Sequence, residues 1–297
     1  MSNLKTKRVQ IGDHSTATNN FVMHQSDTPD GKVHISNGTL DDHTSKMTLT
    51  HDGKLGVGTD SPGALLSIPA GGSSTPRFAI ESATDDNDFT ITQYEDGNGT
   101  YTMLGQNVKL NSGGNNTVSD AAHKTAGIQF DARNNGTLTF VTGAANTATE
   151  NMQISSAGYV TTPNQPCFSV THNTVSSVDA RSGYVAFRSI NTTYINQGNH
   201  FTSSDGRFTA PVAGNYLFGC TLRYDSFTDQ YFYVTIKKND AYGARDLKSS
   251  NGNYLHASVH VILPMAVNDY VHVGLNSNAD SSIDINSDTH FYGYLLG

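Results

Sequence analysis

The stretch that decides the fold is Phe208-Thr-Ala-Pro-Val-Ala-Gly-Asn-Tyr-Leu-Phe218. Pro211 and Gly214 bracket a tight turn, because proline presets the backbone for a turn and glycine tolerates conformations that strain other residues. After the turn, Tyr216 and Phe218 fall on the same face of a strand, since side chains alternate between the two faces. The stretch therefore predicts a turn followed by a strand whose aromatic face lies in a core.

Further strand-like runs follow this stretch. Tyr231–Ile236 is rich in aromatic and β-branched residues and ends at the polar turn Lys237–Asp240. Leu255–Ile262 and Tyr270–Leu275 alternate between apolar and polar side chains. No window of about ten residues has a helical apolar stripe that competes with this period of two. Many short strands at regular spacing predict an all-β sandwich or jelly roll.

The composition agrees with a β-structure. At 297 residues the chain is long enough for two or more domains. Hydrophobic residues make up 36% and charged residues only 15%, which is below the usual quarter for charged residues, and glycine occurs 28 times. This mixture favours strands joined by many turns and argues against a helical bundle or a coiled coil.

The charge limits the kinds of partner. A formal net charge of −8 makes nucleic acid an unsuitable partner, because no basic stripe is present to neutralise phosphates. The cluster of Lys5, Lys7 and Arg8 is interpreted as a docking N-terminus, and a nucleic-acid arm is the less favoured alternative. No apolar run approaches the ~18 residues of a membrane span, and the first residues lack the apolar core of a signal peptide. We expect synthesis in a cytoplasm and no membrane insertion.

A series of aromatic and glycine positions leads into the first stretch and closes with Gly-x-Tyr-x-Phe. The series is Ile190, Asn196, Phe201, Phe208, Gly214, Tyr216 and Phe218. Its spacing resembles that of the complement q-subcomponent globular-head family, which shares the tumour-necrosis-factor jelly roll. The chain departs from the family pattern at Ile190 and at Cys220, where aromatic residues are usual, but both substitutes are apolar. Phe291–Leu296 resembles the closing strand of the same family.

This resemblance covers about residues 163 to 297. It implies a C-terminal ten-stranded jelly-roll sandwich that forms tight homotrimers. It also implies a domain that binds other surfaces and performs no chemistry.

The N-terminal half has a different composition. Tyr and Phe together number 19 in residues 163–297 but only 8 in residues 1–162. The N-terminal half cannot easily build an aromatic core alone, so we expect it to find buried area between chains. Met47–Gly53 and Met152–Gly158 are each read as the first strand and turn of a hairpin. We expect such hairpins from three chains to wrap around a common axis.

A second resemblance lies in Gly53-Lys-Leu-Gly-Val-Gly-Thr-Asp-Ser-Pro62. It is similar to an element of bacteriophage tail-fibre and tailspike shafts, and it implies glycines that let strands approach a threefold axis. A phosphate loop is the rejected alternative, because a third glycine is missing and Pro62 would end any following helix. Glu150–Ile154 and Pro163–Pro166 resemble the junction between a fibre shaft and its head.

These observations predict four segments in an intertwined homotrimer. Residues 1–20 form an N-terminal docking segment, and residues 21–74 form a β-hairpin shaft. Residues 75–162 form a small β domain and connector, and residues 163–297 form the jelly-roll head.

Two acidic clusters are candidates for chemistry. The first contains Asp85, Asp86, Asp88 and Glu95. Paired carboxylates cleave glycosidic bonds in many hydrolases, but a solvated turn accounts for this cluster more simply. We therefore predict no catalytic residue and no enzymatic activity.

The second acidic cluster contains Asp280, Asp284 and Asp288. Its oxygen atoms suit a hard cation such as calcium, but the loop lacks the glycine and terminal glutamate of an EF-hand. A polar loop is the favoured interpretation, a calcium site is the alternative, and no other cofactor is expected. Cys167 and Cys220 have no metal-ligand spacing and are predicted to be reduced, buried thiols, with a disulfide formed by later oxidation as the alternative.

The receptor-binding surface is predicted in two parts of the head, residues 224–231 and 240–254. Exposed tyrosines there can stack on sugar rings, and neighbouring Asp and Asn can hydrogen-bond sugar hydroxyls. The tyrosines are Tyr224, Tyr231, Tyr242 and Tyr254, and the polar residues are Asp225, Asp229, Asn251 and Asn253.

Three histidines near this region raise another possibility for ligand binding. His256 and His260 share a predicted strand face, and His272 is assigned to a neighbouring strand. On a threefold axis such residues would form a ring able to take a metal or an anion. Half-exposed polar strand faces are the favoured interpretation.

The sequence favours a trimeric phage tail-fibre protein of the virion that acts in host attachment. Its N-terminus would dock to a baseplate, tail or capsid protein, and its head would bind a glycan or protein of the host surface. The alternative is a structural or decorating virion protein, such as a capsid fibre or tail adaptor, whose head binds another viral protein. Neither hypothesis involves nucleic acid.

Overall fold

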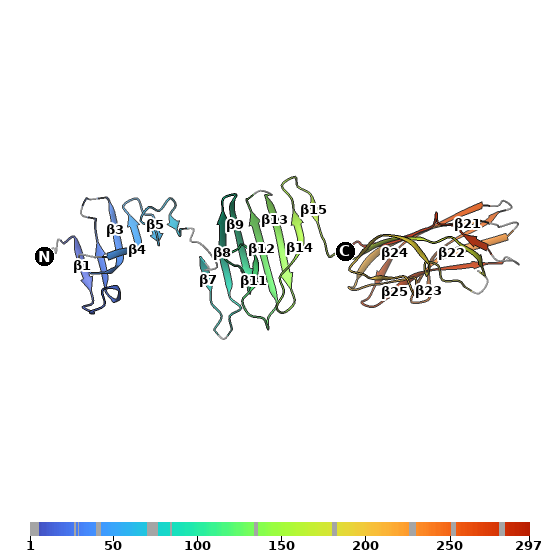
Figure 1. Cartoon of the computed structure of the whole chain (residues 1–297), viewed down its shortest axis with the longest axis horizontal. Helices are drawn as coiled ribbons and strands as arrows, with labels where there is room; N and C mark the ends of the chain where they lie inside the picture. The colour runs from blue at the N-terminus through green and yellow to red at the C-terminus, as the bar shows by residue number, and fades with distance from the viewer. Residues whose placement is uncertain are drawn as a thin grey trace. The chain divides into compact units, whose positions relative to one another are not determined.

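The computed structural model divides the chain into two compact units, Met1–Thr161 and Thr162–Gly297 (Figure 1). The structure describes residues 6–26, 28, 30–39, 43–69, 77–83, 85–133, 136–179, 183–225, 230–250, 254–278 and 283–297. Within these residues the only helical segment is one turn of 3₁₀-helix, η1 (Ala17–Asn19). The prediction of an all-β chain is confirmed.

The N-terminal unit contains fifteen strands in its described residues. They are β1 (Arg8–Ile11), β2 (Phe21–His24), β3 (Lys32–Gly38), β4 (His43–Thr50), β5 (Leu55–Val57), β6 (Leu66–Ser67), β7 (Phe78–Ile80), β8 (Phe89–Asp96), β9 (Gly99–Gln106), β10 (Val108–Leu110), β11 (Asn116–Val118), β12 (Thr125–Asp131), β13 (Thr137–Gly143), β14 (Thr149–Ile154) and β15 (Val160–Thr161). The first strand lies within the segment predicted to dock.

The first sheet of this unit follows the chain in the order β1-β2-β3-β4-β5-β6. Neighbouring strands are antiparallel except for β5 and β6, which are parallel. The turn from β4 to β5 places Gly53 at φ +83°, a left-handed conformation that suits glycine. This β4–β5 pair has the strand–turn–strand arrangement that the Met47–Gly53 pattern predicts.

The second sheet has the order β15-β14-β13-β12-β9-β8-β7, and the hairpin β10–β11 packs against one of its sides. A small core between sheet and hairpin contains Met103, Val108, Leu110 and Val141. Asn107, which precedes β10, is fully buried and has a positive φ of 57°. Its side chain donates to three carbonyl oxygens of the segment between β11 and β12.

The C-terminal unit contains twelve strands in its described residues, whereas the sequence predicts ten. They are β16 (Cys167–His172), β17 (Val175–Val178), β18 (Ile190–Gln197), β19 (Phe201–Thr202), β20 (Arg207–Thr209), β21 (Gly214–Asp225), β22 (Gln230–Lys238), β23 (Ala241–Ser250), β24 (Tyr254–Met265), β25 (Tyr270–Ser277), β26 (Ile283–Ile285) and β27 (His290–Leu295). The difference arises from short strands of two to four residues, such as β17, β19, β20 and β26.

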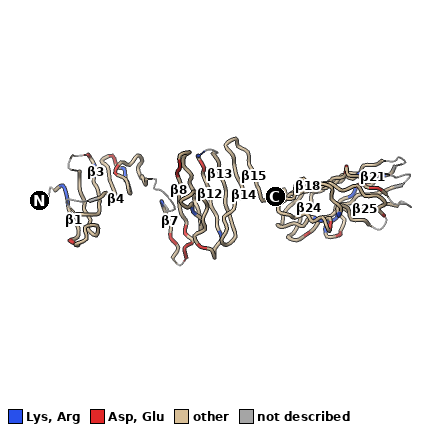
Figure 2. Tube along the Cα trace, viewed as in Figure 1, with Lys and Arg blue, Asp and Glu red and all other residues tan. Residues whose placement is uncertain are grey.

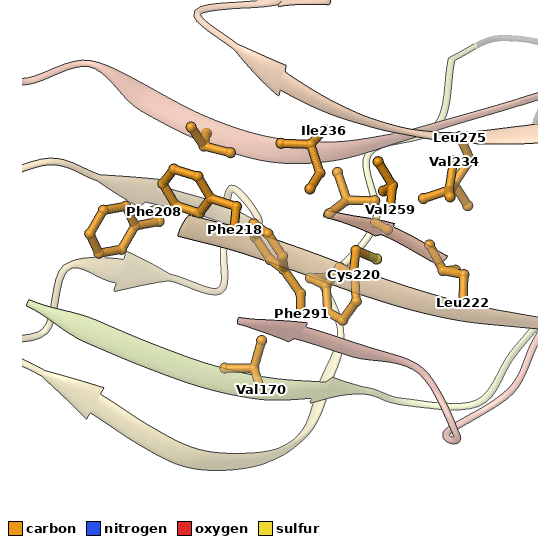
Figure 3. Packing of buried hydrophobic residues seen from close by; sticks show 14 of the residues in the cluster. Val170, Phe208, Phe218, Cys220, Leu222, Val234, Ile236, Val259, Leu275 and Phe291 are labelled. Carbon is orange, nitrogen blue, oxygen red and sulfur yellow. The ribbon is translucent and has the colours of Figure 1, made fainter. Parts of the chain in front are cut away.

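Two sheets of the C-terminal unit face each other across one core. The first has the order β17-β26-β21-β27-β16-β18, with β24 paired to β21, and the second has the order β19-β20-β25-β22-β23. Val234 and Ile236 from the second sheet meet Phe218 and Leu222 from the first (Figure 3). This is the predicted jelly-roll sandwich.

The residues that decide the fold lie at the centre of this core. Phe208, Tyr216 and Phe218 are fully buried, as the alternation predicts. Gly293 of β27 provides room for the Phe218 ring, since a Cβ at that position would lie 2.5 Å from it. The Tyr216 hydroxyl donates to the carbonyl oxygen of Val212 in the preceding turn, so its one polar atom is satisfied.

Candidate binding surface

One face of the β22–β23 hairpin collects tyrosines and cations, and we call it the tyrosine–cation face. It consists of Tyr231, Tyr233, Lys237, Tyr242 and Arg245. Residues between them on β22, from Phe232 to Ile236, alternate into the core, so the tyrosines point away from it. Tyr231 and Tyr242 are 43% and 62% exposed, which leaves aromatic surface open to a ligand.

The cations of this face lie over aromatic rings. The Arg245 guanidinium carbon is 5.3 Å from the centre of the Tyr233 ring and 4.4 Å from that of Tyr242. The Lys237 ammonium is 5.4 Å from the Tyr242 ring centre. Such contacts hold a cation in place and leave its hydrogen-bond donors available.

Arg245 differs from Arg133, another arginine that lies over tyrosine rings, in its ion pairs. Arg133 also lies over two tyrosine rings, but it makes ion pairs with Asp96 at 3.3 Å and Asp131 at 2.8 Å. Arg245 makes no ion pair with a carboxylate within the described part of the chain. Its charge is therefore available to an anionic or strongly polar group of a ligand.

The hairpin turn between β22 and β23 adds a carboxylate, that of Asp240, next to the tyrosine–cation face. Asn239 and Asp240 have φ values of 48° and 65°, the conformation that a two-residue hairpin turn requires. The Asp240 carboxylate accepts a hydrogen bond of 2.6 Å from the Tyr270 hydroxyl, and this bond lowers the pKa of Asp240. Arg207 stacks on Tyr270 at 4.1 Å and extends the row of aromatic–cation pairs.

His272 is almost fully buried. Its strand, β25, pairs with β20 and β22, whereas His256 and His260 lie on β24 in the other sheet. The prediction that His272 lies on a strand next to theirs is therefore wrong. Burial lowers the pKa of His272 to about 4, although the Asp240 carboxylate opposes the shift. His256 and His260 do share an exposed face of β24. A ring built from all three histidines is therefore excluded.

Tyr224 corrects the predicted receptor surface, because its side chain is fully buried. It follows Tyr216, Phe218, Cys220 and Leu222 on the inward face of β21 and packs against the Phe232 ring. Burial raises the pKa of Tyr224 well above its ordinary value. This residue stabilises the core and cannot stack on a sugar.

Asp225 and Tyr254 lie together at one end of the β21–β24 pair, with Arg223 between them. The Arg223 guanidinium is 5.2 Å from the Tyr254 ring and pairs with Asp225 at 2.9 Å and Asp288 at 2.7 Å. Tyr254 is well exposed and can contribute to a ligand surface. It belongs to the other sheet, apart from the tyrosine–cation face.

Two of the three candidate calcium ligands, Asp284 and Asp288, contact groups of the protein itself. Asp288 pairs with Arg223, and Asp284 accepts a hydrogen bond of 2.8 Å from the Ser177 backbone. No cluster able to hold a metal occurs within the described residues. Asp280 lies outside those residues, as do Asp229, Asn251 and Asn253 of the predicted receptor surface.

Tyr231 and Tyr242 of the tyrosine–cation face belong to the predicted receptor surface, whereas Tyr233, Lys237 and Arg245 do not. Tyr233 follows Tyr231 at a spacing of two, so strand alternation alone could have identified it. Lys237 was assigned to a turn, whereas β22 continues to Lys238. Arg245 joins the face through the register of β23, which shifts by one residue between Ile236 and Lys237.

The second unit is similar to known proteins. Residues 167–296 match the family model described as the C1q domain. The C-terminal unit is a C1q/TNF-like jelly roll. The globular domain of zebrafish complement 1qA protein is 18% identical, with coverage of 45% of this chain and 98% of that chain and a TM-score of 0.36. Murine APRIL at pH 8.0 is 12% identical, with coverage of 44% and 99% and a TM-score of 0.35.

No curated protein matches this chain.

The C1q/TNF-like domain contains both cysteines, and both are free, with Cys220 buried and Cys167 partly buried. Burial raises the pKa of both thiols, more strongly for the fully buried Cys220 than for Cys167, and a higher pKa favours the neutral thiol over the reactive thiolate. No helix within the described residues is long and apolar enough to cross a membrane.

Proposed function

We propose that the protein is a trimeric phage fibre that attaches to the virion through its N-terminus and binds the host cell surface through its C1q/TNF-like head. The observation that carries this proposal is the exposed tyrosine–cation face of the head. It offers open aromatic rings and an arginine that makes no ion pair in the described residues. Such a surface suits recognition and has no arrangement for chemical turnover.

The face suits a host glycan. The exposed rings of Tyr231 and Tyr242 can stack on the apolar faces of sugars, while Arg245 and Lys237 donate to hydroxyl or carboxylate oxygens. A single site of this kind binds weakly. Three identical sites on one fibre would gain avidity against a repetitive cell surface.

The homotrimer has support in the head itself. C1q/TNF-like domains are typically trimeric. The outer face of the β16–β27–β21–β24 sheet carries a row of paired side chains, Tyr294, Leu217 and Ile262. Tyr294 and Ile262 are 41% and 58% exposed, and their apolar surface is available for a neighbouring copy.

The test compares binding of the labelled protein to host cells and to virion components. We expect labelling of host cells, interference with infection, and strong loss of both in the double variant Tyr242→Ala with Arg245→Ala. Tyr159→Ala is the control, because Tyr159 is also a well-exposed tyrosine but belongs to the N-terminal unit. Binding to virion proteins without any binding to cells would favour the structural or decorating role instead. Loss of a polymer substrate on incubation would contradict a non-enzymatic fibre.

A further inference from the structure

The first sheet of the N-terminal unit has an apolar face that the described chain leaves open. Its side chains align across strands in two rows. One row is Val9, Met23, Ile35, Met47 and Val57, and the other is Val33, Leu49, Leu55 and Leu66. Each row joins directly paired residues of adjacent strands, so the apolar surface is continuous. Leu66, Leu49 and Met23 are 58%, 50% and 47% exposed.

The opposite face of this sheet shows the reverse distribution. Apart from Val22, its buried side chains are polar: His24, His34, Ser36 and Thr48. They satisfy one another, with His24 bonded to Ser36 at 2.8 Å and His34 to Thr48 at 2.9 Å. A chain that folds alone buries its apolar face and exposes its polar one. The inversion indicates that the apolar face is buried by something other than this chain.

The second sheet repeats the arrangement. Its central row consists of Phe78, Ile91, Leu104, Ile128, Phe140 and Met152, one from each of six adjacent strands. The other side of the sheet is covered by the β10–β11 hairpin. Glu95, at the end of β8, is the only acidic or basic residue at the paired positions of the open side. The other charges of this sheet lie mainly near its strand ends (Figure 2).

We infer that these two open faces are the self-association surface of the chain, each covered by the same face of two further copies. The apolar faces of both sheets must be buried at the same time. A second copy of the chain carries two matching apolar faces, in the same order along its sequence. Any unrelated partner would have to match two separate apolar sheets. The paired positions of the two faces carry one charged residue, Glu95 at the end of β8, so identical copies approach with little like-charge repulsion. The number of copies, three, rests on the proposed homotrimer.

The test places a photo-crosslinking amino acid at Ile128 in the full-length protein. Ile128 lies in the middle of the central row and is 36% exposed. The matched control carries the same amino acid at Lys109, which points away from the core on the hairpin that covers the opposite side. Phe130, in the same strand and on the same face as Ile128, is a second position in case the first variant fails to fold. Light scattering of each variant measures the number of copies before irradiation.

We expect irradiation at Ile128 to give a ladder of covalent species that ends at three copies, with none from Lys109. A trimer that crosslinks at neither Ile128 nor Phe130 would overturn this inference while leaving the proposed trimeric fibre intact. A ladder that ends at two copies would overturn the threefold arrangement. A monomer before irradiation would overturn both this inference and the proposed trimer. Crosslinks to another protein and none between copies would show that the faces serve a different partner.

Discussion

At the scale of single residues, the head is organised around Phe218. Its ring lies 5.7 Å from Phe208, 6.4 Å from Phe168 and 6.5 Å from Phe291, measured between ring centres. These partners come from three other strands, so one side chain joins both sheets of the sandwich. Aromatic pairs at such distances add to the free energy gained from burial alone.

Truncation of this residue tests the core directly. Phe218→Ala should lower the free energy of unfolding of the head by roughly 3–5 kcal/mol, because it removes a fully buried ring and leaves a cavity. Chemical denaturation followed by tyrosine fluorescence measures the change. Tyr242→Ala, at an exposed position, is the control and should have little effect. A Phe218→Ala variant that melts within a degree or two of the wild type would contradict the strand assignment.

A second residue makes the stability of the head depend on pH. Burial lowers the pKa of His272 to about 4 in the folded protein, whereas an unfolded histidine titrates near 6.5. The unfolded state therefore binds more protons between these values, and stability falls as the pH is lowered from about 6.5 to 4. Burial also lowers the pKa of His172, which acts in the same direction. His272→Gln should reduce this slope in denaturation curves measured from pH 7 to pH 5, and an unchanged slope would contradict the assignment.

At the scale of elements, the second sheet depends on how the β10–β11 hairpin is attached. Asn107 holds that attachment: its amide donates to the carbonyl oxygens of Asp120, His123 and Lys124 at 2.9, 3.0 and 3.2 Å, and it accepts from the Asp120 backbone at 2.7 Å. The residue also takes a left-handed conformation that few side chains tolerate. One side chain thus fixes both ends of the covering hairpin.

Two substitutions at Asn107 separate these contributions. Asn107→Ala should destabilise the N-terminal unit by about 3 kcal/mol, because it leaves buried backbone groups unpaired and places Ala at a positive φ. Asn107→Gly loses the same hydrogen bonds without the conformational cost, so it should be more stable than the Ala variant by about 1 kcal/mol. Thermal unfolding of both proteins measures the difference. Equal stability of the two variants would contradict a conformational role.

Strand alternation explains what could be predicted from the sequence at this scale. It identified the inward face of Tyr216 and Phe218, and the same counting would have placed Tyr224 in the core. Strand alternation could not predict that Arg245 lies beside Tyr233, because that contact depends on a register shift within the β22–β23 hairpin. The low aromatic content predicted buried area between chains, but the rows of apolar side chains depend on the pairing of strands across bulges and turns.

At the scale of the whole molecule, the two units expose different amounts of apolar surface. Their stability should therefore depend to different degrees on association with other copies. The C1q/TNF-like head encloses a large core of phenylalanine rings, Tyr216 and Tyr224 within one chain, so we expect it to fold alone. Within its described residues the N-terminal unit has only one small hydrophobic cluster, Met103, Val108, Leu110 and Val141, and it leaves two apolar sheet faces open. Its stability should depend on association, whereas that of the head should depend much less on it.

The mass of the full-length protein tests this dependence. We expect light scattering to give three times the chain mass of 31.8 kDa at micromolar concentration. Ile128→Asp should leave this mass unchanged if the head holds the trimer, but it should make the N-terminal unit far more sensitive to protease, because a charge is placed in the central apolar row. Thr142→Asp, near the edge of the same open side, is a milder control. Equal protease resistance of the two variants would contradict a buried apolar face.

The last prediction concerns which of the two units binds the host cell. The isolated head, residues 162–297, should trimerise and bind host cells, because it carries the tyrosine–cation face. Ile262→Lys places a charge in the apolar outer row and should yield a monomer whose binding is weaker by about 100-fold or more, since avidity is lost. Titration of labelled heads on cells measures both. If the head shows no binding and the N-terminal unit does, recognition lies at the other end of the chain. Tyr94 and Tyr101, which Arg133 contacts, would then be the first residues to test.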